Sequence, residues 1–110
     1  SKDQKYLYVA ASDDDTIKIV DTQALVVTGT LPSGEDPETF ALNPDGNRMY
    51  VSNEDDNEVT VIDIPKAKVF ARLRVGVEPE GIAVSPGNRW LISASETTNM
   101  IHWFDIDTLT

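Results

Sequence analysis

The chain has 110 residues, and its 19 acidic and nine basic side chains give a formal net charge of −10. This excess of negative charge repels phosphate backbones and anionic membrane surfaces, so nucleic acid and membrane lipids are excluded as expected partners. No apolar run approaches the roughly 20 residues that span a bilayer. Without cysteine, the chain has no disulfides, no thiolate nucleophile and no c-type haem attachment motif. The composition agrees with a soluble all-β protein.

Three segments of the chain are copies of one another. Residues 8–21 read YVAASDDDTIKIVD and residues 50–63 read YVSNEDDNEVTVID, a spacing of 42 residues. A more divergent copy, LISASETTNMIHWFD, spans residues 91–105. A period of about 40 to 45 residues that holds several short strands is typical of β-propeller blades. The sequence therefore predicts an all-β partial propeller of about two and a half blades, which span residues 1–38, 39–80 and 81–110.

The shift of 42 residues also aligns residues outside these copies, with one expected deviation. It places Gly34 on Gly76, Pro37 on Pro79 and Glu38 on Glu80. The turn at 86–89 is predicted to be one residue shorter than the turn at 44–48, and the loop after the third copy's second strand one residue longer. Surface connections tolerate such changes.

Alternation and turn residues predict four strands in the second unit, at 39–43, 48–53, 58–64 and 68–75. The third of these strands has apolar residues on both faces, so we expect it to be covered on both. The fourth has one face exposed to solvent, with Lys68, Phe70, Arg72 and Arg74, which is typical of an outer strand. Repeated along the chain, this four-stranded antiparallel meander supplies about ten strands. A ring needs roughly four to eight such blades, so we expect either an excerpt of a longer chain or association of several copies.

The segments YVSNEDDNEVTVID, FALNPDGNRMYVSN and VGVEPEGIAVSP resemble the YVTN-type β-propeller repeat. The combination of NEDDN, VGVEPEG and SETTNM is similar to the propeller proteins associated with PQQ-dependent alcohol catabolism. The third unit departs from the repeat, with Leu91-Ile92-Ser93-Ala94 where the tetrad is expected. The resemblance implies a non-catalytic propeller, periplasmic or at the cell surface, that accompanies quinoprotein dehydrogenases and their c-type cytochromes.

The predicted topology places most acids on one face of the disc. In an antiparallel blade, the hairpin between the second and third strands and the link to the next blade emerge on the same side. No lysine or arginine lies in these loops, and residues such as Lys18 and Arg72 are assigned to the opposite face and the outer strands. The candidate docking residues on this acidic face are Asp13, Asp14, Asp15, Asp36, Glu38, Glu54, Asp55, Asp56, Glu78, Glu80 and Glu96, with Thr97, Thr98 and Asn99 of the SETTNM segment.

Three interpretations of the acidic face stay open. The acids can simply be solvated turn residues, since aspartate favours turns. They can dock a cationic partner, such as a basic cytochrome or a dehydrogenase, because summed like charges steer association. They can also bind calcium, which takes about six to eight oxygen ligands. The runs DDD and EDDN offer only two or three of these, and no glycine-punctuated calcium loop is present.

Catalysis is less favoured than binding. Phosphate-cradling GxxxxGK loops and the GxSxG elbow are absent. A propeller lactonase would carry carboxylate, asparagine or histidine side chains on its innermost strands, which here read TFALN and GIAVS. Trp90, His102 and Trp103 are expected to pack rather than bind a cofactor, and no cofactor is predicted. The sequence thus favours a non-catalytic interaction module; a lactonase-type or other hydrolytic fragment and a cell-surface structural repeat protein are the alternatives.

Overall fold

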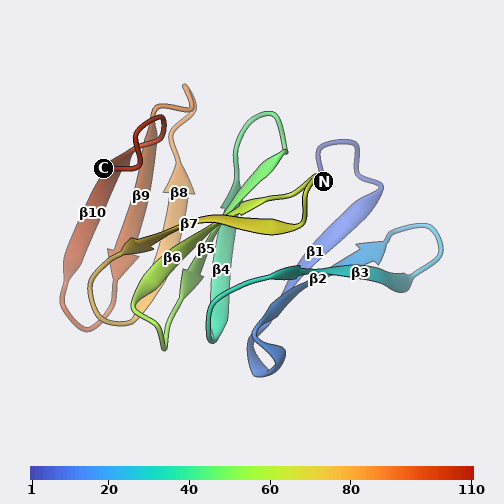
Figure 1. The fold of residues 1–110 in the computed structure, drawn as a ribbon, viewed down its shortest axis with the longest axis horizontal. Helices are drawn as coiled ribbons and strands as arrows, with labels where there is room; N and C mark the ends of the chain where they lie inside the picture. Colours follow the sequence, from blue (N-terminus) through green and yellow to red (C-terminus); the bar gives the residue numbers. More distant parts are fainter.

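The computed structural model describes residues 1–110 and contains three antiparallel sheets that lie side by side, each forming one blade (Figure 1). The predicted all-β partial propeller is confirmed, and no helix is long and apolar enough to cross a membrane. Only a short 3-10 turn, η1 (Ser12–Asp14), interrupts the strands. Blade 1 contains β1 (Tyr6–Ala11), β2 (Thr16–Asp21) and β3 (Val26–Pro32); blade 2 contains β4 (Pro37–Leu42), β5 (Arg48–Asn53), β6 (Glu58–Asp63) and β7 (Lys68–Arg74); blade 3 contains β8 (Pro79–Val84), β9 (Trp90–Ser95) and β10 (Met100–Asp105).

The repeat of 42 residues holds for every strand, without insertion or deletion. The expected shorter turn at 86–89 was wrong, because the amide of Gly46 donates to Asn43 O and the amide of Asn88 donates to Ser85 O, each at 2.9 Å. Gly46 and Asn88 both have positive φ, +72° and +55°. Asparagine replaces glycine here because its short polar side chain tolerates the left-handed conformation. In this register the tetrad of the third unit begins one residue later than expected, at Ile92.

The hydrophobic core lies between neighbouring blades rather than within one sheet. Ile17, Leu31, Met49, Val51 and Ile62 fill the space between blades 1 and 2. The second cluster, between blades 2 and 3, is Tyr50, Val59, Val61, Leu73, Leu91 and Ile106. Successive residues of β6 thus enter different clusters, as the strand pleat dictates. The expectation that the third strand is covered on both faces is confirmed.

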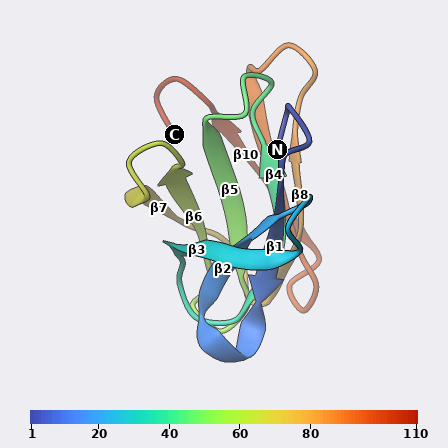
Figure 2. The same ribbon diagram turned by 90° about the vertical axis from the view of Figure 1, so that its right-hand side faces the viewer.

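Blade 2 runs from the inner strand β4 to the outer strand β7, whereas blade 1 begins at its second strand and blade 3 ends at its third; Figure 2 shows the sheets from the side. The inner strand β4 lies against β8, whereas the outer strands β3 and β7 touch less. In β7, Val69, Ala71 and Leu73 turn inward, whereas the alternating residues Lys68, Phe70, Arg72 and Arg74 are exposed, which confirms the outer strand. The inner strands begin at Pro37 and Pro79. The predicted start at residue 39 was two residues late, because proline fits the first position of a strand.

The far face of blade 3 is not covered. Trp103 was expected to pack, but the residue is 60% exposed and its ring touches Trp90 edge-on, with 6.4 Å between the ring centroids. His102 instead turns to the opposite face of the sheet and stacks on Phe104. The free face of blade 3 therefore presents aromatic and aliphatic side chains to water.

Candidate functional site

The link between blades 1 and 2 is held between two hairpins on the predicted acidic face. The amide of Asp36 donates to Asp15 Oδ1 in the hairpin of blade 1, at 3.0 Å. On the other side, the amide of Glu35 donates to Asp56 Oδ2 in the hairpin of blade 2, at 2.7 Å. The amide of Glu54 closes the arrangement by donating to Asp36 O at 3.1 Å. Four predicted docking residues thus have structural hydrogen bonds: Asp15, Asp36, Glu54 and Asp56.

The link between blades 2 and 3 repeats this arrangement with other side chains. The amide of Glu78 donates to Asn57 Oδ1 at 3.1 Å, and the amide of Glu96 donates to Glu78 O at 3.0 Å. The hydroxyl of Thr97 donates to the carboxylate of Glu78. Both links and the three hairpins therefore lie on one face, where the structure places all the predicted docking residues. Their role in docking stays a prediction.

Glycine is required where each link passes its hairpin. A Cβ on Gly34 would lie 2.6 Å from Asp56 Oδ2 and 2.9 Å from Asn53 Cγ. A Cβ on Gly76 would lie 2.8 Å from Ser95 Oγ. Asn53 is fully buried, and its amide nitrogen donates to Ser33 Oγ at 2.8 Å. The glycines shared by the two links thus reflect a close approach of backbone to hairpin.

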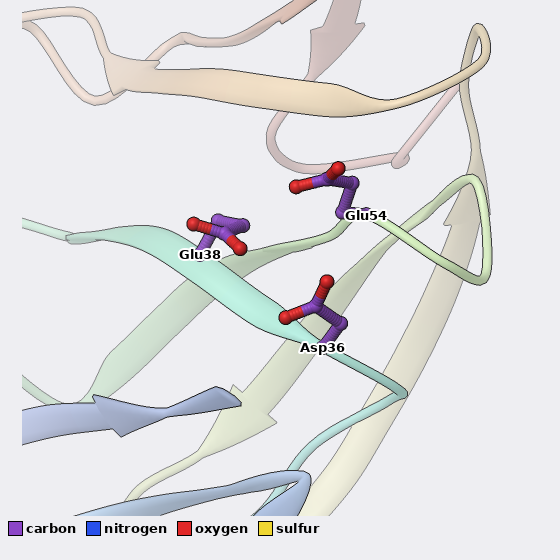
Figure 3. A group of neighbouring side chains, drawn as sticks. All are labelled: Asp36, Glu38 and Glu54. Carbon is purple, nitrogen blue, oxygen red and sulfur yellow. The ribbon is translucent and has the colours of Figure 1, made fainter. Parts of the chain in front are cut away.

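Three carboxylates converge beside the inner end of blade 2, as Figure 3 shows. Oxygen atoms of Asp36, Glu38 and Glu54 lie within 4.8 Å of one another. Partial loss of hydration, followed by the charge of Asp36, raises the pKa of Glu38. Partial loss of hydration and the charge of Glu38 raise the pKa of Glu54. This acid triad is a set of oxygen ligands of the kind that calcium or another hard divalent cation prefers.

The equivalent residues of the next blade are Glu78, Glu80 and Glu96, which we call the second acid triad because of their repeat positions. The charge of Glu80 is the main cause that raises the pKa of Glu96, and Glu78 adds to it. The two triads also interact, because the charge of Glu80 contributes to the raised pKa of Glu38. In blade 1 the position of Glu54 is held by Ser12, whose hydroxyl donates to Pro37 O at 3.1 Å. Negative charge is thus concentrated along the inner strands of blades 2 and 3.

This placement corrects the sequence interpretation of the innermost strands. Glu38 lies on β4 and Glu80 on β8, so each inner strand carries a carboxylate. They were assigned to loops because each strand was predicted to begin after its glutamate. The side chains that discriminate a lactonase-type propeller are therefore present at one end of these strands.

Two basic side chains reach the acidic face, which the sequence did not predict. Lys18 Nζ lies 3.3 Å from Asp14 Oδ2. Arg72 extends from the outer strand, where its Nη1 lies 3.9 Å from Glu58 Oε2 and donates to Thr60 Oγ1 at 3.4 Å. Segregation of charge is therefore incomplete, although neither ion pair involves a residue of the two triads.

Blades that fan outward from touching inner strands define a β-propeller. A family model described as YNCE-like beta-propeller matches residues 3–109, and the chain belongs to this family. Among solved structures, Kuenenia stuttgartiensis hydrazine synthase is 28% identical, with a TM-score of 0.91 over 99% of this chain and 32% of that one. The structure titled dihydro-heme d1 dehydrogenase NirN in complex with DHE is 25% identical, with a TM-score of 0.80 over 96% of this chain and 22% of that one. The chain thus spans a third or less of these neighbours, and no curated protein matches it.

Proposed function

We propose that this chain is part of a non-catalytic propeller module that docks a cationic protein through its acidic loop face. The observation that carries the proposal is the pair of adjacent acid triads, with which no lysine or arginine forms an ion pair. Partial loss of hydration and neighbouring carboxylates raise the pKa of Glu38 and of Glu54, and the charge of Glu80 raises the pKa of Glu96. A lysine or arginine side chain of a partner would relieve this repulsion. Complementary charge of this kind raises association rates and fixes the orientation of a complex.

The partner class proposed is a basic cytochrome or a dehydrogenase, in an extracytoplasmic setting. Support comes from the resemblance of NEDDN, VGVEPEG and SETTNM to propellers associated with PQQ-dependent alcohol catabolism. A second support is the likeness to hydrazine synthase and to NirN, a dihydro-haem d1 dehydrogenase by its title. The periplasmic or cell-surface location and the quinoprotein association are parts of this proposal.

The test compares two double variants with the same net charge. Asp55→Asn with Glu80→Gln neutralises exposed acids of the acidic face that no base pairs with. Asp45→Asn with Asp107→Asn neutralises two exposed acids in the opposite turns. With a basic c-type cytochrome as the probe, the first pair should slow association severalfold at low salt and flatten its dependence on ionic strength. Equal effects of both pairs would show a response to net charge alone and refute a docking face.

Calcium is the second candidate ligand, favoured by the convergence of Asp36, Glu38 and Glu54. Calcium added to the protein should then raise its Tm, and Glu38→Gln should abolish that shift. A Tm that does not respond to calcium removes this candidate.

A lactonase-type hydrolase is the catalytic alternative, and the carboxylates on β4 and β8 are the observation that favours it. Lactone hydrolysis in the presence of calcium that is lost in Glu38→Gln with Glu80→Gln would support it. Turnover that is absent, or unchanged in this variant, would exclude it.

A further inference from the structure

A hollow lies between blades 1 and 2, on the side of the disc away from the acidic hairpins. Its volume is about 400 Å³, and sites for small molecules measure about 300–1,000 Å³. All three strands of blade 1 contribute to it, and blade 2 closes it. Its lining includes Tyr6, Tyr8, Ile19, Asp21, Thr28 and Ile64, and we call it the tyrosine hollow. Both tyrosines reach solvent, since Tyr6 is 41% exposed and Tyr8 is half-buried.

The equivalent positions of blade 2 hold a cation on an aromatic ring. A shift of 42 residues places Tyr6 on Arg48 and Thr28 on Phe70. The guanidinium carbon of Arg48 lies 4.3 Å from the centroid of the Phe70 ring. Such a contact is favourable because the face of an aromatic ring is negative. Tyr50, the equivalent of Tyr8, is fully buried. The fold thus places an organic cation of its own at the position that stays open in blade 1.

Two residues of β3 leave this position open. Thr28 occupies the bulge of β3, as Phe70 occupies the bulge of β7, but its side chain is much smaller. Gly29 follows it, where blade 2 has Ala71. A Cβ on Gly29 would meet only Ile19 Cδ1 within 4 Å, at 3.7 Å, which is an ordinary contact. Packing therefore does not require a glycine here, and the missing side chain adds to the hollow.

The tyrosine hollow has a single charge, which is negative. Asp21 is its one charged residue, and no lysine or arginine forms an ion pair with it. Its Oδ1 accepts two backbone amides of the following turn, at 2.9 and 2.8 Å, so Oδ2 is left for a ligand. An adjoining hollow of about 530 Å³ shares both tyrosines but carries charges of both signs, on Lys2, Asp3 and Asp45. Selection for a positive ligand is therefore confined to the tyrosine hollow.

We propose that the tyrosine hollow binds a small organic cation with an alkylated ammonium or guanidinium head. The head would lie against the rings of Tyr6 and Tyr8, with its charge balanced by Asp21. Aromatic side chains recognise such cations in many binding sites. The site lies on the opposite side of the disc from the acid triads, so the inference does not depend on docking of a cationic protein.

The test titrates the chain with choline and with methylguanidinium, followed by the NMR resonances of the tyrosine rings. The neutral control is the alcohol in which carbon replaces the nitrogen of choline. Both cations should shift the resonances of Tyr6 and Tyr8 with a Kd on the order of 1–10 mM, and the neutral alcohol should bind about fivefold more weakly. Tyr50 is the one other tyrosine, and its buried ring should not respond.

A variant that copies blade 2 should fill the site. Tyr6→Arg with Thr28→Phe reproduces the pair of Arg48 and Phe70, and it should abolish the response of Tyr8 while the circular dichroism stays unchanged. The matched control is Val27→Arg with Thr30→Phe, which adds the same charge and ring at exposed positions of β3 outside the hollow and should keep the Kd. A second variant, Tyr6→Leu, keeps the hollow and removes one ring. It should weaken choline binding severalfold and leave binding of the neutral alcohol unchanged.

Three results would overturn the proposal. The first is the absence of any tyrosine shift with either cation at concentrations about tenfold above the expected Kd. The second is binding of the neutral alcohol as tight as that of choline, because the hollow would then select for shape and not for charge. The third is unchanged choline binding in Tyr6→Arg with Thr28→Phe, which would place the ligand elsewhere.

Discussion

Replacing Gly34 with alanine tests how closely the links are held against the hairpins. The added Cβ would lie 2.6 Å from Asp56 Oδ2 and 2.9 Å from Asn53 Cγ, so at least one of these side chains must move. Asn53 is fully buried and held by Ser33 and Thr60. Movement of Asp56 instead breaks its hydrogen bond with the amide of Glu35. Displacing either side chain therefore lowers the stability of the folded protein.

The expected loss of stability in Gly34→Ala follows from these contacts. Overpacking costs about 1–3 kcal/mol, and loss of the bond between Glu35 and Asp56 costs about 1 kcal/mol. The lower conformational entropy of alanine in the unfolded chain offsets about 0.4–1 kcal/mol. We therefore expect Gly34→Ala to lower the free energy of unfolding by about 2 kcal/mol, measured by urea denaturation followed by circular dichroism.

Gly87→Ala is the matched control, because a Cβ there meets no atom within 4 Å and the backbone φ is not positive. It should change the free energy of unfolding by no more than about 1 kcal/mol, in the stabilising direction. Equal effects of the two substitutions would refute the close approach of link and hairpin.

Three further predictions concern single side chains. The raised pKa of Glu38 means that its ionised form destabilises the folded state, so Glu38→Gln should stabilise the protein at pH 7. This gain should disappear as the pH falls through the raised pKa and below the ordinary value of 4.5, which denaturation across pH would show. Ala67 has φ +51° on an exposed turn, so Ala67→Gly should raise the free energy of unfolding by about 0.5–1 kcal/mol; a loss of stability in the same denaturation assay would contradict this. The buried hydroxyl of Ser93 has no partner where blade 2 has Val51, so Ser93→Ala should leave the Tm unchanged or raise it, and a clear fall would disprove the unpaired state.

The sequence predicted the number and order of the strands because the repeat and the alternation are both local properties. It misplaced the start of β4 because Pro37 and Glu38 read as a turn. The comparison of the repeats also placed a one-residue deletion near Asn88. The residue types alone do not show that Asn88 adopts the same left-handed backbone conformation as Gly46.

The candidate site was predicted only in outline. Chain topology alone places the hairpins and links on one face, so the set of acids could be named. Their grouping into triads could not, because it depends on the approach of the inner strands β4 and β8. The pairing of Arg72 with Glu58 was missed for a related reason, since a long side chain on an outer strand reaches a face that its own backbone does not occupy.

The hydrogen bonds that hold each link between two hairpins also affect the entropy of binding. Backbone amides of Glu35, Asp36 and Glu78 are all fixed by side chains of neighbouring hairpins. The carboxylate side chains of each link therefore extend from backbone positions that are fixed before any partner binds. Loops that are ordered in advance lose little conformational freedom on association. The spacing of the charges in these links is therefore set by the folded backbone and not by the partner.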